Sequence, residues 1–277
     1  MLLVVKAAEG IWTPDLLITN QPLHQLSYGG TMARIRSSIK KLPITCSVTS
    51  FYFYLLPEVM ICGVDEAGRG PCFGPLVVAG VLVENDAELV RIGACDSKQL
   101  TPKQREELAP LIKNIATKNE LIVLPAADID DLRKTMTLNE LEVFVYSKII
   151  EKLRPDVCYV DAVDVNEGRF GRDILSHLSF KPKMISEHKA DAQYPIVGAA
   201  SILAKVTRDE HVRKIAQELE PGLNLPLGSG YPADPVTKKF LETWVARFGS
   251  LPPYVRHSWE TCQKLMQNHK TKRLDQF

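Results

Sequence analysis

The sequence carries almost no excess charge of either sign. Its 277 residues include 34 Lys and Arg against 33 Asp and Glu, for a formal net charge of +1. The chain as a whole therefore lacks the large excess of basic residues that marks many nucleic-acid-binding domains. Any nucleic-acid partner would have to be held by a local basic patch beside a local acidic site.

Paired cysteines are also missing. The six cysteines are scattered and form no C-x-x-C pair, and His188 and His257 have no His or Cys partner at zinc-ligand spacing. We therefore expect neither a disulfide framework nor a zinc site. Several cysteines lie in apolar runs, where a reduced thiol acts as a small hydrophobe. This usage favours a reducing, cytoplasmic setting.

A third absence is a long apolar run. The most apolar early stretch, 51–64, is interrupted by Pro57 and Glu58 and is too short to span a bilayer. The first ten residues lack a basic region followed by a long apolar core, which makes them a poor signal peptide. We expect no membrane segment. The 45% hydrophobic and 24% charged residues instead fit a globular protein, and the length suits one large domain or one domain with appendages.

Residues 1–59 differ from the rest of the chain. They show no sustained helical or strand period, and 32–41 is a short basic stretch. A disordered extension is one interpretation and a functional arm is another. We favour a third, in which the natural start is Met60. A native N-terminal peptide from upstream of Met60 would exclude it.

Strand and helix signals alternate from Met60 onward. Apolar runs rich in β-branched residues predict strands at 60–66, 76–84, 119–125, 156–161 and 183–187. Two helices are predicted to begin at capping boxes, those of Thr101 and Thr137. Apolar periodicity predicts three more helices, at 196–219, 235–248 and 257–268. This alternation indicates an α/β fold, with the first three strands paired antiparallel.

Acidic residues follow two of the predicted strands. Asp65 and Glu66 lie where the first strand meets a glycine-rich turn, and Asp161 ends the fourth strand. Ligand sites of open α/β sheets form at such strand ends. Asp191 precedes the long helix, on a predicted loop that would reach the same crevice. For each acid taken alone, a solvated turn or a helix cap is the commoner role.

Four converging carboxylates would repel one another unless divalent cations neutralised them. Ligand sets made only of oxygen favour Mg²⁺ or Mn²⁺ over zinc. Two such ions, about 3.5–4 Å apart, would clamp a phosphodiester for in-line cleavage. The residues alone thus lead to a hard-metal site as a hypothesis.

Five ordered motifs resemble those of type 2 ribonucleases H, the ribonuclease HII family. They are GVDEAGRGPCFGPLVVAGV, DSKQLTPKQREEL, YVDAVDVN, EHKADAQYPIVGAASILAKVTRDE and GSGYPADPVTKKFL. The similarity runs from Met60 to about Cys262 and is nearest to the archaeal and eukaryotic catalytic-subunit branch. It implies a ribonuclease H-like fold, a central mixed sheet flanked by helices. The catalytic core would cover 60–220, and a helical C-terminal part would cover 221–277.

The resemblance also implies roles for the matching residues. The catalytic, metal-binding acids would be Asp65, Glu66, Asp161 and Asp191. The residues Gly68, Arg69 and Gly70 fall on the family's ribose-sensing turn. Tyr231 falls on the tyrosine that stacks on the sugar and holds its 2′-OH. A plain tight turn and a half-buried tyrosine are the alternatives.

Basic residues within the same motifs would contact phosphates, which positions a duplex without reading its sequence. These substrate-binding residues would be Lys98, Lys189 and Arg208, with Lys98 the first choice. An extension of this track over the helical end would use Lys238, Lys239, Arg256 and His257. A solvated surface charge is the commoner fate of each.

The implied enzyme hydrolyses the RNA strand of RNA/DNA hybrids and single ribonucleotides embedded in duplex DNA. Cleavage 5′ to the ribonucleotide would leave a 3′-hydroxyl and a 5′-phosphate, with Mg²⁺ or Mn²⁺ as the cofactor. One alternative is a non-catalytic duplex-binding module, which the intact acids disfavour. The other is a structure-specific DNA nuclease of the same fold. Its DNA substrate would have no 2′-OH for Tyr231 to sense.

The last seven residues, TKRLDQF, resemble a degenerate sliding-clamp-binding tail. An apolar residue is followed by two spacers and a terminal aromatic, but the usual leading Gln and second aromatic are absent. A frayed, solvated tail is the alternative. The family resemblance favours a monomer.

Overall fold

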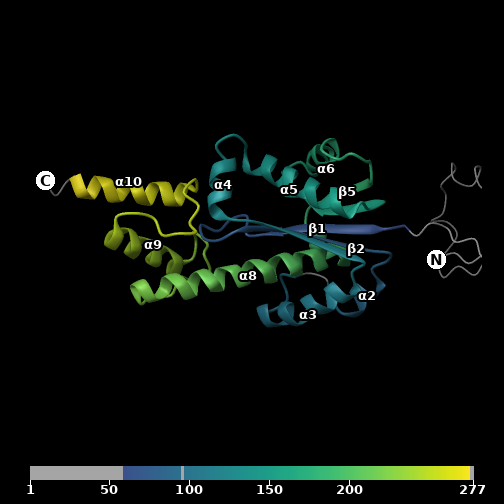
Figure 1. Cartoon of the computed structure of the whole chain (residues 1–277), viewed down its shortest axis with the longest axis horizontal. Helices are drawn as coiled ribbons and strands as arrows, with labels where there is room; N and C mark the ends of the chain where they lie inside the picture. The colour runs from purple at the N-terminus through teal and green to yellow at the C-terminus, as the bar shows by residue number, and fades with distance from the viewer. Residues whose placement is uncertain (1–58, 95–96, 275–277) are drawn as a thin grey trace, which may run out of the picture. The chain divides into compact units, whose positions relative to one another are not determined.

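Figure 1 shows the computed structural model of the chain, which describes residues 59–94 and 97–274. The predictions for residues 1–58 lie outside the described residues. At the centre are the strands β1 (Ile61–Ala67), β2 (Leu76–Val83), β3 (Lys118–Leu124), β4 (Val157–Asp161) and β5 (Lys183–Glu187). They form one mixed sheet in the order β3-β2-β1-β4-β5. The first three strands pair antiparallel, as predicted, whereas β4 runs parallel to β1 and to β5.

The described helices are α2 (Ala87–Arg91), α3 (Pro102–Ile115), α4 (Ala126–Leu132), α5 (Leu138–Leu153), α6 (Glu167–Ser176), α7 (Ala190–Gln193), α8 (Pro195–Leu223), α9 (Pro235–Phe248) and α10 (Glu260–Leu274). Both predicted capping boxes are present, at Thr101 and Thr137. Four helices were not predicted, namely α2, α4, α6 and α7. With four to seven residues each, α2, α4 and α7 are too short to show a clear apolar period, whereas the ten residues of α6 are amphipathic and the prediction missed them.

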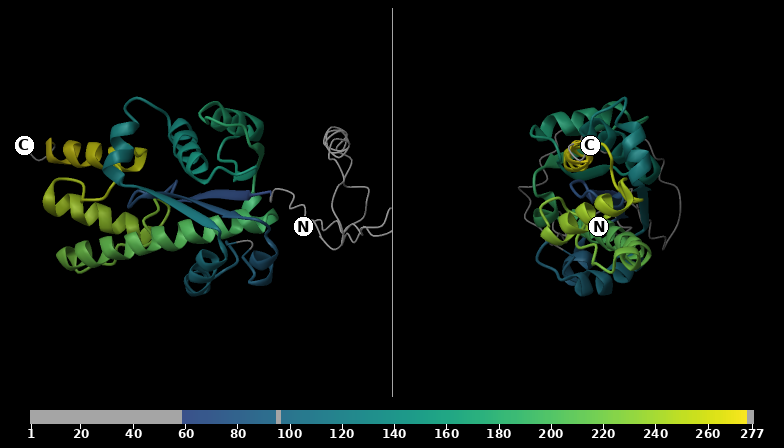
Figure 2. Two further views of the ribbon diagram at one scale, coloured as in Figure 1. Left: turned by 45° about the vertical axis from the view of Figure 1, so that its right-hand side comes forward. Right: turned by 90° about the vertical axis from the view of Figure 1, so that its left-hand side faces the viewer.

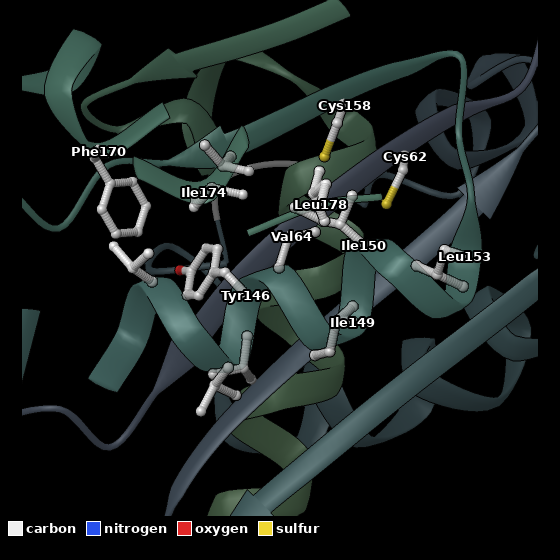
Figure 3. Close-up of a cluster of buried hydrophobic side chains, with 14 of the residues drawn as sticks. Cys62, Val64, Tyr146, Ile149, Ile150, Leu153, Cys158, Phe170, Ile174 and Leu178 are labelled. Carbon is white, nitrogen blue, oxygen red and sulfur yellow. The ribbon is translucent and has the colours of Figure 1, made fainter. Parts of the chain in front are cut away.

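The sheet is covered on both faces. Helix α8 lies along one face and α5 and α6 lie over the other (Figure 1). Because side chains alternate along a strand, Cys62 and Val64 of β1 face α5, where they pack with Tyr146 and Ile149 (Figure 3). Every residue of β2 is buried, as expected for a strand enclosed on both faces.

A glycine sets the distance between α8 and the sheet. A Cβ added at Gly63 of β1 would lie 2.4 Å from the backbone carbon and oxygen of Ile196, in the first turn of α8. Only a residue without a side chain allows this close approach. The contact holds the start of α8 against the middle of β1 and β4, and α7 lies just before it in the chain.

The C-terminal part is helical, as predicted. Helix α9 lies between α10 and the C-terminal half of α8 (Figures 1 and 2), and a third apolar cluster fills the space between them. Helix α8 continues through residue 220, the predicted boundary between core and C-terminal part. Among the described residues, no helix has the length and apolar character needed to cross a membrane.

The predicted start of the final helix was wrong. We predicted a final helix over 257–268, but α10 begins at Glu260. The N–H groups of His257 and Ser258 donate instead to the carboxylate of Asp130, at 2.7 and 2.9 Å. These two residues are therefore tied to α4, outside the helix.

Candidate active site

The predicted acids lie at the carboxyl end of two neighbouring strands. Asp65 stands near the end of β1, and Asp161 is the last residue of β4, whose Val160 is in register with Val64. Asp191 of α7 completes the group, since ligand oxygens of Asp65, Asp161 and Asp191 all lie within 4.8 Å of one another. Sequence positions as far apart as 65 and 191 thus form one acidic site.

The setting of Asp191 differs from the prediction. We predicted a loop, but Asp191 lies in the four-residue helix α7, which follows Lys189 in the left-handed conformation (φ 57°). The N–H of Ala190 donates to the Asp161 carboxylate at 3.0 Å, and the N–H of Tyr194 to the Ala190 carbonyl at 2.8 Å. The first bond ties the short helix to the end of β4, and the second closes the helix itself.

Glu66 faces the other side of the sheet. Adjacent strand residues point to opposite faces, so Asp65 is directed towards α8 and Glu66 towards α5. There, the hydroxyl of Tyr146 donates to the Glu66 carboxylate. Burial, together with the charge of Glu66, raises the pKa of Tyr146 well above its usual value, so it remains a donor. Sequence reasoning missed Tyr146, because it lies in the apolar stripe of α5.

Burial of the acids makes their ionised forms costly. Desolvation, followed by the charges of Glu66 and Asp161, raises the pKa of Asp65 well above its usual value. Desolvation also raises the pKa of Asp161 and of Glu66. Asp65 is only 3% exposed and Asp191 only 1%. A cluster of this kind is stable when ionised only if cations neutralise it.

Two lysines supply part of that neutralisation. Nζ of Lys98 lies 3.1 Å from Oδ2 of Asp191. Burial alone would lower the pKa of Lys98, but its bond to Asp191 and the nearby acids outweigh this and raise it. Lys205 of α8 donates to Ser97 and, at 2.9 Å, to Ser201. Burial lowers the pKa of Lys205 despite the charges of Asp65 and Asp191.

The donor set fits a hard divalent ion. All three converging groups are carboxylates, and oxygen ligands suit Mg²⁺ or Mn²⁺. Oδ2 of Asp191 is buried and accepts no hydrogen bond, although it lies beside the Lys98 ammonium. A buried carboxylate oxygen in this state keeps a lone pair for a further cation.

The predicted ribose-sensing turn follows directly after these acids. Gly68 has φ +90°, and a Cβ there would lie 2.4 Å from the Pro75 carbonyl oxygen, so the turn requires glycine at this position. The ring of Tyr231 packs on Gly70, with its Cε1 3.5 Å from where a Cβ would be. The N–H of Cys72 donates to the Gly230 carbonyl at 2.7 Å, which joins the turn to the Tyr231 loop.

The predicted basic residues have different settings. Lys98 and Lys189 are exposed, whereas Arg208 is 8% exposed and donates to the Ser229 carbonyl at 2.9 Å. Its guanidinium also lies 5.3 Å from the centre of the Tyr231 ring. The Arg69 side chain points to the start of α5, where it pairs with the buried Glu142 and donates to Asn139 at 2.7 Å.

One residue of the predicted phosphate track was assigned wrongly. Lys238, Lys239 and His257 are exposed, but Arg256 is fully buried. Its donors reach backbone carbonyls of the glycine-rich segment, at 3.1 Å for Gly74. No phosphate can reach a side chain in this position, because the fold itself covers it.

Comparisons with known proteins agree with this geometry. The family model described as ribonuclease HII matches residues 62–262. A ribonuclease HII from Pyrococcus abyssi is 44% identical, over 77% of this chain and 94% of that protein. The chain belongs to the ribonuclease HII family. A second ribonuclease HII, from Pyrococcus furiosus, is 45% identical over 78% of this chain and 97% of that protein.

Solved structures of this family share the fold. The ribonuclease H2 from Pyrococcus horikoshii OT3 matches with a TM-score of 0.70 and 42% identity, over 76% of this chain and 99% of that one. The PCNA:RNase HII complex from Archaeoglobus fulgidus contains a match with a TM-score of 0.68 and 38% identity, over 78% of this chain and 100% of that one. The predicted family, the ribonuclease H-like fold and the enzyme class are confirmed: the protein is a ribonuclease HII, an endoribonuclease.

Proposed function

We propose that this ribonuclease HII cuts the RNA strand of RNA/DNA hybrids and duplex DNA at single embedded ribonucleotides. Cleavage occurs 5′ to the ribonucleotide and leaves a 3′-hydroxyl and a 5′-phosphate. The observation that carries this proposal is the convergence of Asp65, Asp161 and Asp191, whose oxygens lie within 4.8 Å. The Gly68–Gly70 turn begins only three residues after Asp65, and the ring of Tyr231 packs beside its Gly70.

Asp65, Asp161 and Asp191, with Glu66 from the opposite face, would hold two divalent ions, Mg²⁺ or Mn²⁺. Such ions, when bound, lower the pKa of an attacking water and stabilise a leaving 3′-oxygen. Tyr146 holds the Glu66 carboxylate in one orientation. Lys98 offsets the charge of Asp191, and its side chain, 62% exposed, would be free to contact a phosphate of the substrate.

The turn and Tyr231 select the ribonucleotide. Gly70 has no side chain, so a sugar can approach the backbone beside the Tyr231 ring. The ring is 41% exposed and offers a flat surface with a hydroxyl, which suits a sugar and its 2′-OH. The guanidinium of Arg208 packs against this ring and donates to the carbonyl of Ser229 in the same loop. Lys189 is exposed beside Asp191 and would contact the backbone of the duplex.

The first test uses an end-labelled duplex with one ribonucleotide in an otherwise DNA strand. We expect Mg²⁺ or Mn²⁺ to support a single cut 5′ to the ribonucleotide, and EDTA to prevent it. An all-DNA duplex of the same sequence is the control and should stay intact. Folded protein that binds both duplexes but cuts neither would instead support a duplex-binding module, and equal cutting of both would support a DNA nuclease.

A sliding clamp is a second proposed partner. The related structure from Archaeoglobus fulgidus is a complex of RNase HII with PCNA. In this chain, the segment 271–277 ends in the apolar residue, two spacers and aromatic of a degenerate clamp-binding tail. Its last three residues lie outside the described ones. A clamp pull-down with the full chain and with the last seven residues removed tests this, and equal capture would exclude the tail.

The monomeric state is also proposed, from the family resemblance. Light scattering of the full chain should give a mass near 31.0 kDa. A mass of twice this value would contradict it.

A further inference from the structure

Three consecutive carbonyl groups of the Gly68–Gly70 turn accept hydrogen bonds from one segment of the C-terminal part. The Arg256 guanidinium donates to the carbonyl oxygens of Gly68, at 2.5 Å, and Arg69, at 3.0 Å. The indole N–H of Trp259 donates to the carbonyl oxygen of Gly70, at 3.2 Å. The turn that follows the catalytic strand is thus held by residues about 190 positions later in the chain.

The chemistry of this contact requires arginine. Arg256 is fully buried, and a buried cation is tolerated only when its donors are satisfied. Its planar fork reaches the carbonyls of Gly68, Arg69 and Gly74 together. Burial lowers the pKa of Arg256 to about 10, so it stays charged at neutral pH. Lysine, a point charge on a flexible stem, cannot span the same acceptors.

The segment that carries Arg256 is itself anchored on both sides. Its backbone N–H donates to the Cys72 carbonyl at 2.9 Å, and the N–H of Gly74 donates to the Tyr254 carbonyl at 3.0 Å. Asp130 of α4 accepts from the two residues that follow Arg256. The guanidinium is therefore held rigidly beneath the turn.

This contact orients the other side of the turn. In a planar trans peptide, the carbonyl points opposite to the N–H of the next residue. Fixing the carbonyls of Gly68 and Arg69 therefore directs the N–H groups of Arg69 and Gly70 away from Arg256. Neither N–H has an acceptor among the described residues. The turn thus presents two oriented donors, and the ring of Tyr231 packs beside Gly70.

We propose that Arg256 is a positioning residue for ribose recognition, which acts with Trp259 by holding the Gly68–Gly70 turn in its 2′-OH-sensing conformation. The inference rests on the proposed role of this turn as the ribose sensor. It gives the C-terminal part a role in substrate selection through a buried contact. Arg256 touches neither the substrate nor the acids, so its loss changes preference more than general duplex affinity.

The experiment measures equilibrium binding of the full chain to two duplexes of one sequence, with and without a single ribonucleotide. Ca²⁺ replaces Mg²⁺, and gels verify that neither duplex is cut. Preference is the ratio of the two dissociation constants. The variants are Arg256→Lys, which keeps the charge but loses the fork, and Trp259→Phe, which keeps a ring but loses the donor. Leu241→Ala is the control, because it weakens the C-terminal core without touching the turn.

We expect Arg256→Lys to lower the preference about tenfold and Trp259→Phe to lower it less, with unchanged affinity for all-DNA duplex. Leu241→Ala should lower the melting temperature and leave the preference unchanged. Wild-type preference in both variants would overturn the proposal, as would an equal loss of affinity for both duplexes. If Arg256→Lys fails to fold, Trp259→Phe decides. A wild-type protein without preference would reject the ribose sensor itself, before any variant is compared.

Discussion

The acid cluster and the Gly68–Gly70 turn follow the same strand, yet different parts of the molecule hold them. Asp65 and Asp161 are placed by the register of β1 and β4, and Asp191 by the close contact of α8 with Gly63. The turn is instead held from the C-terminal part, through Arg256. The site for the chemistry is thus built by the core sheet, and the site for substrate selection depends on a distant segment.

The two regions also differ in charge. Buried carboxylates dominate the acid cluster, and desolvation raises the pKa of Asp65. Arginines surround the turn, with Arg208 and Arg256 both buried. Metal ions should therefore change the stability of the acid cluster and leave the turn unaffected. Variants of the acid cluster and of the turn should therefore change metal binding and ribonucleotide preference separately.

The largest effect is expected for Asp65→Asn. The change keeps the volume of the side chain but removes a charge shared by the metal-binding acids, and we expect at least about a 10³-fold loss of cleavage. Binding and preference for a ribonucleotide should survive, because the turn is held separately. Single-turnover cleavage and duplex binding measure the two properties. Normal turnover by this variant would contradict the role of Asp65.

The next effect is expected for Tyr231→Ala. Loss of an aromatic stacking surface lowers affinity for a nucleotide by about 10- to 100-fold. Cleavage at an isolated ribonucleotide should fall accordingly, with little change in melting temperature, because the ring is 41% exposed. Tyr254→Phe, at a similarly exposed tyrosine bonded to Glu218, is the control. A parallel loss of stability and activity in Tyr231→Ala would indicate a structural tyrosine.

A smaller effect is expected for Tyr146→Phe. This change removes the hydroxyl that orients Glu66, and groups that orient metal ligands contribute about 10- to 100-fold to metal affinity or activity. The Mg²⁺ concentration for half-maximal cleavage should rise about tenfold, while ribonucleotide preference stays constant. Tyr159→Phe, on the α8 face of the neighbouring strand, is the control. An unchanged Mg²⁺ dependence would show that Glu66 needs no such partner.

The smallest effect is a change of stability with pH in the absence of metal. Desolvation raises the folded-state pKa of Asp65, Asp161 and Glu66 above their unfolded values. At a pH below the unfolded-state pKa values, these groups stabilise the folded protein. This contribution is lost as the pH rises through their folded-state pKa values. Metal-free protein should therefore melt at a higher temperature after Asp65→Asn at pH 7, and saturating Mg²⁺ should reduce that difference. A lower melting temperature for metal-free Asp65→Asn than for the metal-free wild type at pH 7 would contradict the unfavourable ionisation of the buried acids.

The strands and the acids were predictable because both follow local rules. Short apolar runs marked each strand, and the acids at the ends of β1 and β4 meet because the two strands run parallel and in register. Asp191 was predicted from its position before the long helix, but its own helix was not. Four residues are too few to show a helical period, so α7 looked like a loop.

The supporting residues were less predictable because they depend on contacts across the chain. Tyr146 looked like an ordinary core residue of α5, and its bond to Glu66 arises only when α5 packs over the sheet. Arg256 looked like a surface cation, since nothing near it in sequence indicates burial. Lys205 had one signal: it follows a long run of small and apolar residues in α8, where a lysine would need partners.

The most direct test compares Asp65→Asn and Tyr231→Ala on one duplex that contains a single ribonucleotide. Cleavage, the preference over all-DNA duplex and the affinity for Mn²⁺ are measured for both variants in the same buffers. The account predicts that Asp65→Asn loses cleavage and keeps its preference, whereas Tyr231→Ala loses preference and keeps the Mn²⁺ affinity of the acid cluster. Loss of preference in Asp65→Asn, or loss of Mn²⁺ affinity in Tyr231→Ala, would contradict separate support for the two regions.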